Sequence, residues 1–302
     1  MTAAAAAEIL SPAQMRAVEA AAFDSGAVDG LTLMERAGAA AVAEIRATWP
    51  EFAARPGRAV VLCGPGANGG DGYVVARLLA EYNWSVRLFR FGDPARAKGD
   101  AAVMRRWLAL GPERPLSETS DAAGPVDLVI DALFGTGLAR PLPAEVFAAW
   151  DALAPAAART VALDAPLGLC LETGRARPET RAADMTVTFH RAKLGHLVEA
   201  GPDACGRLAV ADIGLQAYAA AAGEAARAVR GPTAPLGKAE GGHKYDHGHA
   251  LVLAGGVARG GAARLAARAA LRVGAGLVTV GAPGAALIEN AARLDAVMLR
   301  RV

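Results

Sequence analysis

Residues 64–72 read Gly-Pro-Gly-Ala-Asn-Gly-Gly-Asp-Gly, and they directly follow the apolar run Ala-Val-Val-Leu-Cys at 59–63. The next segment, 73–80, has helical character. Glycine permits positive φ and lets a ligand come close to the backbone. A loop that opens a helix also points unpaired N–H groups outward, which favours an anion such as phosphate. The stretch therefore predicts a phosphate-bearing ligand at a strand-to-helix turn.

The spacing of Gly64, Gly66 and Gly69 matches the G-x-G-x-x-G fingerprint of dinucleotide-binding turns. Taken alone, this fingerprint is weak, because a purely structural turn can also satisfy it. Asn68 and Asp71 add an amide and a carboxylate that a plain dinucleotide turn does not need. Their oxygen atoms indicate a ligand hydroxyl or a hard cation at the same loop.

Strands and helices alternate outward from this loop. The expected strands are 59–63, 85–91, 126–131, 160–164, 185–189 and 207–211. The first expected helix begins at Ser11-Pro12. Further helices are expected over 32–49, 71–82 and 98–110, and another ends near residue 153. This alternation predicts an α/β fold, a Rossmann-like three-layer sandwich whose mostly parallel sheet has helices on both faces.

Three polar clusters fall at the ends of expected strands. Asn68 and Asp71 follow the first strand, while Asp131 and Asp164 end two later strands. Ligands of such sheets bind beyond the carboxyl ends of the strands. A single aspartate more often caps a helix or a turn. Three clusters beside glycines nevertheless predict a common site.

Composition limits the class of protein. The chain has 302 residues, 53% of them hydrophobic, which is enough for one large domain or two ordinary ones. A formal net charge of +2 gives no reason to expect nucleic acid or a membrane surface as partner. Three cysteines without C-x-x-C spacing fit a reducing compartment. No segment resembles a signal peptide or a membrane span, so we expect a cytoplasmic protein.

The chain is expected to divide into a first domain over 1–215, a linker over 216–240 and a second α/β segment over 241–302. In the last segment the pattern predicts strands at 249–254 and 276–280 and a helix at 262–273. About sixty residues are too few for a complete domain of this class. We therefore expect exposed apolar surface and poor stability for this segment, testable by limited proteolysis.

Five ordered motifs carry a family resemblance that covers residues 10 to 215. They are the loop 64–72 and the segments 33–38, 131–138, 161–169 and 186–197. In this order they resemble the NAD(P)H-hydrate epimerases, the YjeF N-terminal family. The resemblance implies an isomerase of nicotinamide nucleotide repair that interconverts R- and S-NAD(P)H-hydrate (NADHX and NADPHX).

The resemblance also implies a set of binding residues. Asn68 and Asp131 would bind a potassium ion. Ala67 and Leu167 stand where the family usually has asparagine and serine, so at Leu167 only the backbone could contribute to the metal site. The damaged dinucleotide would be bound by Ala67, Asn68, Gly69, Gly70, Asp71, Gly135, Thr136, Gly137, Leu138, Ala139, Arg140, Pro141 and Asp164.

Inversion of the hydrated ring carbon requires the hydroxyl to leave and return on the other face, or the ring to open and close. Either route needs acid–base groups and stabilisation of an iminium-like state. We expect Asp164 and Lys193 to be the catalytic residues. The alternative for Lys193 is an ordinary exposed lysine. His190 and His196 are expected to be structural or surface residues.

The segments 243–249, 261–266 and 274–279 resemble the start of the ADP-dependent NAD(P)H-hydrate dehydratases, which have a ribokinase-like fold. Bifunctional bacterial proteins of the Nnr type join the two domains in this order. A complete second domain would be a lyase that uses ADP or ATP with Mg²⁺. Its later catalytic motif would lie beyond Val302, so we expect no dehydratase activity from this chain.

Other readings remain open. An NAD-dependent dehydrogenase would use the loop at Gly64 for pyrophosphate and Asp93 for a ribose. A non-catalytic nucleotide-binding or scaffold protein would bind the ligand without turnover. The C-terminal segment alone could be a kinase-like fragment. The N-terminal helices, which are rich in Ala and Met, could mediate a homodimer.

Overall fold

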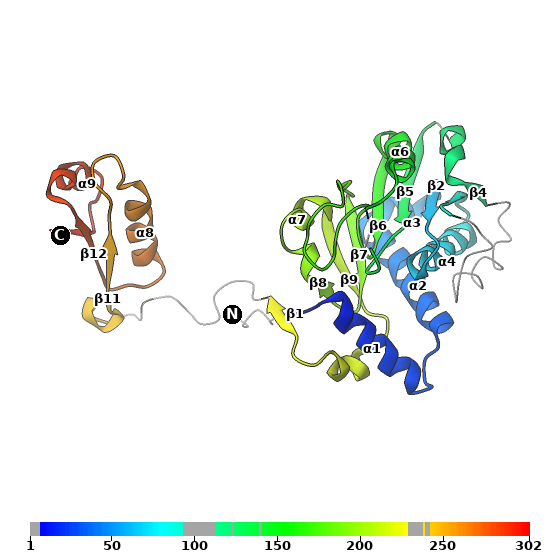
Figure 1. Cartoon of the computed structure of the whole chain (residues 1–302), viewed down its shortest axis with the longest axis horizontal. Coiled ribbons are helices and arrows are strands. Elements are labelled where there is room, and N and C mark those ends of the chain that lie inside the picture. The colour runs from blue at the N-terminus through cyan, green and yellow to red at the C-terminus, as the bar shows by residue number, and fades with distance from the viewer. Residues whose placement is uncertain (1–6, 93–112, 123, 139–140, 229–237, 239–241) are drawn as a thin grey trace. The chain divides into compact units, whose positions relative to one another are not determined.

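The computed structural model describes residues 7–92, 113–122, 124–138, 141–228, 238 and 242–302. Two compact units are present, Ala7–Ala228 and a C-terminal unit within Val229–Val302 (Figure 1). The expected helix at 98–110 lies outside the described residues.

A seven-stranded sheet forms the centre of the larger unit. All its neighbouring strands pair in parallel, in the order β4-β3-β2-β5-β6-β7-β9. The strands are β2 (Arg58–Cys63), β3 (Ser85–Arg90), β4 (Arg114–Pro115), β5 (Val126–Ala132), β6 (Ala157–Leu163), β7 (Met185–Phe189) and β9 (Arg207–Ala211). The predicted parallel α/β sheet is confirmed. The chain runs outward from β2 to β3 and then returns to β5 on the other side of β2, so the strand order reverses between β2 and β5.

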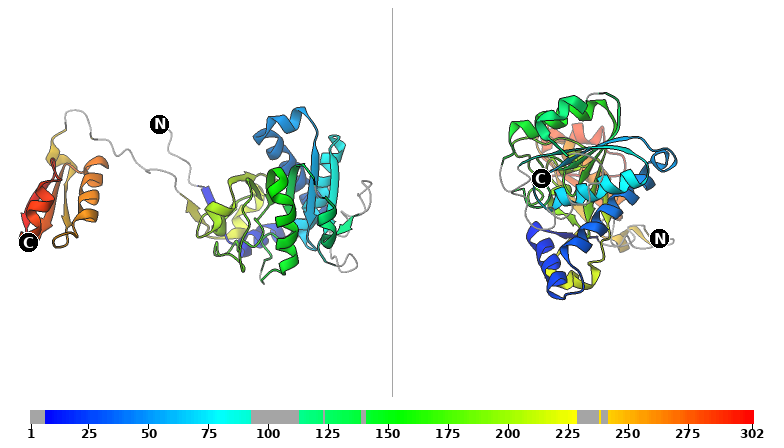
Figure 2. Two further views of the ribbon diagram at one scale, coloured as in Figure 1. Left: turned by 90° about the horizontal axis from the view of Figure 1, so that it is seen from above. Right: turned by 90° about the vertical axis from the view of Figure 1, so that its right-hand side faces the viewer.

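Helices cover both faces of this sheet (Figure 2). One face carries α1 (Pro12–Asp24), α2 (Gly30–Thr48) and α4 (Ala67–Glu81), and the other carries α6 (Ala144–Leu153) and η3 (Leu116–Ala122). In β2, Val61 and Cys63 join the first core cluster, while Val60 and Leu62 join the second. Burial on both faces explains why β2 is an uninterrupted apolar run rather than an alternating one.

The helix after the glycine loop starts earlier than predicted. The sequence indicated 71–82, but α4 begins at Ala67 with Gly66 as its N-cap. Asn68 and Asp71 therefore lie in the first two turns of the helix, and both are buried. Glycine disfavours a helix in isolation, but here it allows close packing: a Cβ on Gly72 would lie 2.5 Å from the Cβ of Ala132.

A small sheet joins the two ends of the larger unit. It has the order β10-β1-β8, formed by β1 (Ala7–Leu10), β8 (Ala192–Lys193) and β10 (Ala226–Ala228). The structure therefore places part of the expected 216–240 linker inside this unit. The 3-10 helix η6 (Gln216–Ala222) packs on α1, as Figure 1 shows. A three-residue strand gives no recognisable pattern in the sequence, and its pairing depends on distant residues.

Short elements complete the larger unit: α3 (Pro50–Ala54), η4 (Ala154–Ala156), η5 (Leu194–His196) and α7 (Gly201–Ala204). The three cysteines Cys63, Cys170 and Cys205 are buried free thiols. Among the helices in the described ranges, none is long and apolar enough to cross a bilayer.

The C-terminal unit has a parallel sheet in the order β11-β12-β13. Its core includes Ala267, Val278 and Val280, while Leu251 and Leu253 on β11 are 65% and 69% exposed. The expected apolar exposure in this segment is therefore observed. The elements are η7 (Lys244–His247), β11 (His249–Leu253), α8 (Gly261–Arg272), β12 (Leu277–Ala282), η8 (Gly284–Ala286), α9 (Leu287–Ala291) and β13 (Met298–Arg301).

The loops after β2 and β5 approach each other so closely that position 64 has no room for a side chain. A Cβ at position 64 would lie 1.8 Å from the carbonyl oxygen of Leu133. Gly64→Ala must therefore force apart the segments after β2 and β5, and we expect it to lower the free energy of unfolding by about 2 kcal/mol or more. The measurement is urea denaturation. Gly137→Ala is the matched control, because a Cβ there meets nothing within 4 Å. Equal midpoints for the two variants would contradict this account.

Candidate active site

A cavity of about 400 Å³ opens at the carboxyl ends of the central strands. It lies where the strand order reverses between β2 and β5, the place where sheets of this kind bind ligands. Residues from the glycine loop, from the segment after β5, from the end of β6 and from α1 share it. The lining residues are Met15, Arg16, Glu19, Pro65, Gly66, Ala67, Asn68, Asp71, Leu133, Phe134, Gly135, Thr136, Gly137, Asp164, Phe189 and Lys193.

The N-terminus of α4 forms one wall of the cavity. The first helical bond of α4 runs from the Gly70 N–H to the Gly66 carbonyl, 3.2 Å. The amides before Gly70 therefore have no partner within the helix. A Cβ on Gly66 would meet nothing within 4 Å, whereas one on Gly69 would lie 1.9 Å from the carbonyl oxygen of Gly64. Gly66 thus leaves room for a ligand beside free N–H groups, and Gly69 is required for packing.

Asp164 connects the segments around the cavity. It follows β6 with a φ of 58°, in the left-handed region that aspartate tolerates better than most residues. Its Oδ1 accepts hydrogen bonds from Lys193 Nζ (3.0 Å) and Thr188 Oγ1 (2.9 Å). Its Oδ2 accepts one from the Thr136 N–H (2.9 Å). A Cβ on Gly135 would lie 2.6 Å from this oxygen, so glycine there lets the loop reach the carboxylate.

Lys193 is buried, with only 1% of its surface exposed. Besides Asp164, its Nζ donates to Thr188 Oγ1 (2.8 Å) and to the carbonyl oxygen of Phe189 (3.2 Å). The three ammonium protons thus each have an acceptor, as a buried charge requires. The alternative prediction, an ordinary exposed lysine, is wrong.

The acidic groups of the cavity differ in proton affinity. Burial would raise the pKa of Asp164, but the Lys193 ammonium and the hydrogen bonds to the carboxylate hold it below its ordinary value. Burial and the negative charges of Asp164 and Glu19 raise the pKa of Asp71 well above its ordinary value. Burial also raises the pKa of Glu19. One carboxylate is therefore held ionised beside two carboxyl groups that take up protons more readily.

His196 supports the main chain around Asp164. Its Nδ1 accepts a hydrogen bond from the Lys193 N–H (3.0 Å), so its Nε2–H donates to the Asp164 carbonyl oxygen (2.7 Å). Burial lowers the pKa of His196 to about 4, which keeps the ring neutral. This agrees with the expected structural role. His190 is buried too, and its ring nitrogens have no hydrogen-bond partner among the described residues.

Asn68 and Asp131 provide the polar atoms that a cation would need. Within the described ranges, Oδ1 and Nδ2 of Asn68 and Oδ2 of Asp131 are buried without a hydrogen-bond partner. The other oxygen of Asp131 accepts from the Leu133 N–H (3.0 Å). Burial raises the pKa of Asp131 to about 7. A bound cation would give these side-chain oxygens a partner, and amide and carboxylate oxygens are of the chemical type that suits a potassium ion.

The Leu167 backbone does not suit the metal site. Its carbonyl oxygen accepts hydrogen bonds from the Arg181 N–H (3.0 Å) and from Thr180 Oγ1 (2.9 Å), which occupy its two lone pairs. The expected backbone ligand therefore has no free electron pair. Leucine offers no side-chain oxygen in its place.

The predicted substrate residues are only partly brought together. Ala67, Asn68, Asp71, Gly135, Thr136, Gly137 and Asp164 line the cavity, whereas Gly69, Gly70, Leu138 and Pro141 do not. Ala139 and Arg140 lie outside the described residues.

Sequence reasoning missed one wall of the cavity, the α1 residues Met15, Arg16 and Glu19, as well as Phe134 and Phe189. The sequence feature that could have indicated this wall is the spacing of Glu19, which follows the buried Met15 by one helical turn and so lies on the same side of α1.

Residues 30–195 match the family model described as YjeF-related protein N-terminus, which covers more than half of the chain. The chain belongs to this family. It is 41% identical over 232 residues to the NAD(P)H-hydrate epimerase of Roseobacter litoralis, covering 69% of this chain and 99% of that protein. It is 44% identical over 197 residues to the corresponding protein of Rhodobacter capsulatus, covering 63% of this chain and 91% of the relative.

Longer relatives also match. The bifunctional NAD(P)H-hydrate repair enzyme Nnr of Methanothermobacter thermautotrophicus is 36% identical over 291 residues, covering 92% of this chain and 53% of the relative. The chain thus spans about half the length of this bifunctional protein. The crystal structure of yeast YNL200c has a TM-score of 0.55 and 16% identity, covering 68% of this chain and 88% of the yeast chain. That likeness confirms the fold.

The buried ion pair makes a prediction about stability. Lys193→Met leaves the Asp164 carboxylate buried without its charge partner, which should cost about 3–5 kcal/mol of unfolding free energy at pH 7. The double variant Asp164→Asn/Lys193→Met removes both charges and should recover much of that loss. Urea denaturation of the two variants tests this. Equal instability in both would show that the unpaired charge is not the cause.

The pH dependence of His196 makes a second prediction. In the unfolded chain this ring takes up a proton near pH 6.5, but in the folded protein only near pH 4. Stability contributed by the neutral ring is therefore present above pH 6.5 and is lost as the pH falls toward 4, by about 3 kcal/mol. Chemical denaturation between pH 7 and 4 should show a shallower decline for His196→Gln than for the unmodified chain. Parallel declines would contradict the assignment.

Proposed function

We propose that this chain acts as an NAD(P)H-hydrate epimerase that interconverts the R and S forms of NADHX and NADPHX. The observation that carries the proposal is the buried Asp164–Lys193 ion pair, which borders the same cavity as the N-terminus of α4. Phosphate recognition and charged groups for proton transfer are thereby within reach of one dinucleotide. The family relatives named as epimerases support this conclusion.

The dinucleotide would bind across the carboxyl edge of the sheet. Its phosphates would face the free amides that precede Gly70 and the loop at Gly135–Gly137. Asn68 and Asp71 would accept or donate hydrogen bonds to its hydroxyl groups. The apolar side chains of Met15 and Phe189 line the cavity and offer contact area to the hydrated ring.

Epimerisation requires the bond between the ring carbon and its hydroxyl to break. A proton from Lys193 Nζ would let the hydroxyl depart as water, while the ring nitrogen lone pair forms a double bond to that carbon. The ionised Asp164 carboxylate would stabilise the resulting positive charge. Water would then add to the other face of the ring and release one proton. Lys193 and Asp164 would act as acid and electrostatic stabiliser.

Asn68 and Asp131 would hold the potassium ion of this family. When bound, the ion supplies a fixed positive charge at the carboxyl edge of the sheet. The structural support is the pair of buried oxygens without a partner in the described part of the chain. Leu167 is not included among the ligands.

The C-terminal unit is proposed to be the beginning of an ADP-dependent NAD(P)H-hydrate dehydratase domain, with the domain boundary after Ala228 rather than at 215. Support comes from the bifunctional relatives, whose alignment extends across it. In a complete domain, ADP or ATP with Mg²⁺ would be the cofactor. A cytoplasmic location and a homodimer remain predictions.

The dehydrogenase alternative depended on Asp93, which lies outside the described residues. The binding-protein alternative shares the whole site and differs only in turnover. An assay of turnover therefore distinguishes both from the epimerase.

The experiment is chiral chromatography of R-NADHX after incubation with the purified chain, with and without potassium. We expect the S epimer to form well above the spontaneous rate, and Asp164→Asn to lower kcat at least about 10²-fold. Asp24→Asn on the exposed end of α1 is the matched control. No acceleration by a folded sample would favour ligand binding without catalysis, and hydride transfer to NAD would favour the dehydrogenase.

A further inference from the structure

A third acidic side chain, Glu19, reaches the cavity from α1. Met15, Arg16 and Glu19 form the α1 wall, whereas Asp164 and Lys193 come from segments that follow sheet strands. A ring bound in the cavity can therefore meet acid–base groups from two different elements. No motif of the glycine loops includes Glu19.

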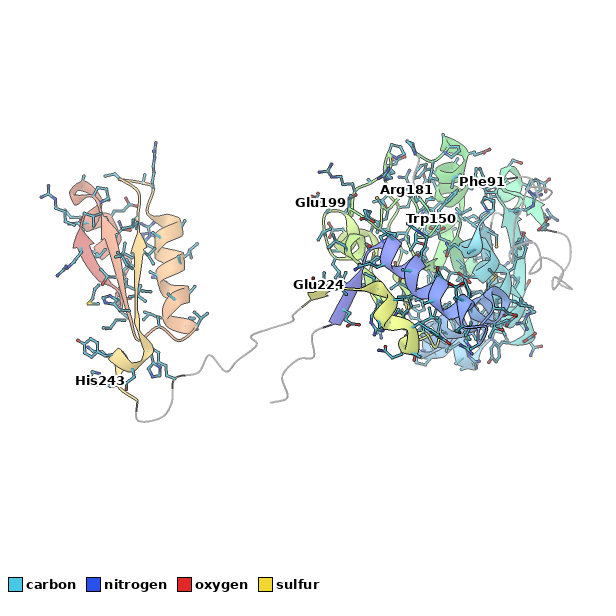
Figure 3. The ribbon with its side chains drawn as sticks, turned by 60° about the horizontal axis from the view of Figure 1, so that its bottom comes forward. Phe91, Trp150, Arg181, Glu199, Glu224 and His243 are labelled. Carbon is cyan, nitrogen blue, oxygen red and sulfur yellow. The ribbon has the colours of Figure 1, made fainter. Side chains whose placement is uncertain are left out.

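The position of α1 is fixed by contacts along its length. Ser11 and Gln14 form a capping box at its start. The Gln14 side-chain amide donates to the carbonyl oxygens of Ala222 (3.1 Å) and Glu224 (2.9 Å), and Glu224 is labelled in Figure 3. At the other end, Ser25 Oγ donates to the hydroxyl of Tyr218 (3.1 Å). A side chain on such a helix is held against the cavity without a loop movement.

The carboxyl group of Glu19 has no structural task that accounts for it. Among the described residues, it makes no hydrogen bond or ion pair, although it is half-buried. Asp164 contrasts with it, because three donors fix the Asp164 carboxylate. A carboxylate that is saturated in this way is a poor proton acceptor, whereas the oxygens of Glu19 are free to take up a proton.

Burial and the neighbouring charges together set the pKa of Glu19. Burial raises its pKa most strongly, Lys193 and Arg16 oppose this, and the Asp164 carboxylate adds to it. Asp71 also faces the same space, and its own pKa is raised partly by Glu19. The net effect raises the pKa of Glu19 above its ordinary value, so Glu19 takes up a proton more readily than an exposed glutamate does.

We propose that Glu19 is the second proton-transfer group of the epimerisation, acting from α1, whereas Lys193 acts from β8. This inference rests on the proposed epimerase function. For one epimer, Lys193 gives a proton to the departing hydroxyl, and the C–O bond breaks as the C=N bond forms. Water then adds from the α1 side, forming the new C–O bond, and its proton passes to the Glu19 carboxylate. The reverse reaction uses protonated Glu19 and neutral Lys193, and solvent returns the protons between turnovers.

Asp71 is the competing carboxyl group in the cavity. It is only 9% exposed and lies in the first turns of α4, beside the amides assigned to the phosphates. Glu19 is half-buried and therefore keeps contact with solvent. The partly exposed Glu19 can exchange its proton with water directly, whereas Asp71 is more deeply buried and is closer to the proposed phosphate site, so Glu19 suits the role better.

The test compares Glu19→Gln with the unmodified chain in the R-NADHX assay, with initial rates measured across pH. Glu51→Gln is the matched control, since Glu51 is exposed on α3. We expect Glu19→Gln to lower kcat at least about 10²-fold while KM changes by less than about threefold, and to remove one limb of the pH–rate profile. Urea denaturation should show an unchanged or higher midpoint, because a half-buried charge is lost.

Each outcome decides the matter. If the unmodified chain epimerises R-NADHX and Glu19→Gln retains its kcat, the role of Glu19 is overturned and the epimerase function stands. A higher KM with unchanged kcat would make Glu19 a binding residue and also overturn the proposal. If the unmodified chain itself shows no turnover, the proposed function fails, and the role of Glu19 with it.

Discussion

The buried ion pair of Asp164 and Lys193 is the interaction on which the site depends. The Asp164 carboxylate accepts hydrogen bonds from the Thr136 N–H in the loop after β5, from the Thr188 hydroxyl on β7 and from the Lys193 ammonium on β8. Its carbonyl oxygen accepts from His196. A carboxylate at this depth would be costly without partners, so these bonds are needed together. They also offset the left-handed backbone of Asp164, a conformation of order 1–3 kcal/mol less favourable for a residue with a side chain.

This arrangement gives similar side chains different tasks. Asp164 is kept ionised by its donors, Asp131 lies deeper and faces a proposed cation, and Glu19 stays half-buried without a fixed partner. Asp164 and Glu19 line the same cavity, where carboxyl groups whose surroundings move their pKa values apart can serve as stabiliser and as acid or base. The proposed epimerisation uses this difference directly.

Much of the fold followed from local pattern. The apolar run at 59–63 indicated a buried strand, and the alternation of strands and helices along the chain indicated a parallel sheet, because both signals depend only on neighbouring residues. The start of α4 at Ala67 was not predictable in the same way. Glycine disfavours a helix by itself, and only the close packing of Gly72 on Ala132 makes glycine suitable there. The pairing of β10 with β1 likewise joins the two ends of a long segment.

The sequence by itself determined the fold class, the glycine-rich loop at 64–72 and the acidic residues at strand ends, since each is encoded by residue type and short spacing. Only the tertiary structure decided how these parts meet. The order of the strands places Asn68 and Asp131 at one reversal point, the burial of Lys193 turns an ordinary lysine into an ion-pair partner, and α1 brings Glu19 to the cavity. Such contacts join residues that are not neighbours in the sequence, such as Asp164 and Lys193, and their energies depend on burial, which no local pattern specifies.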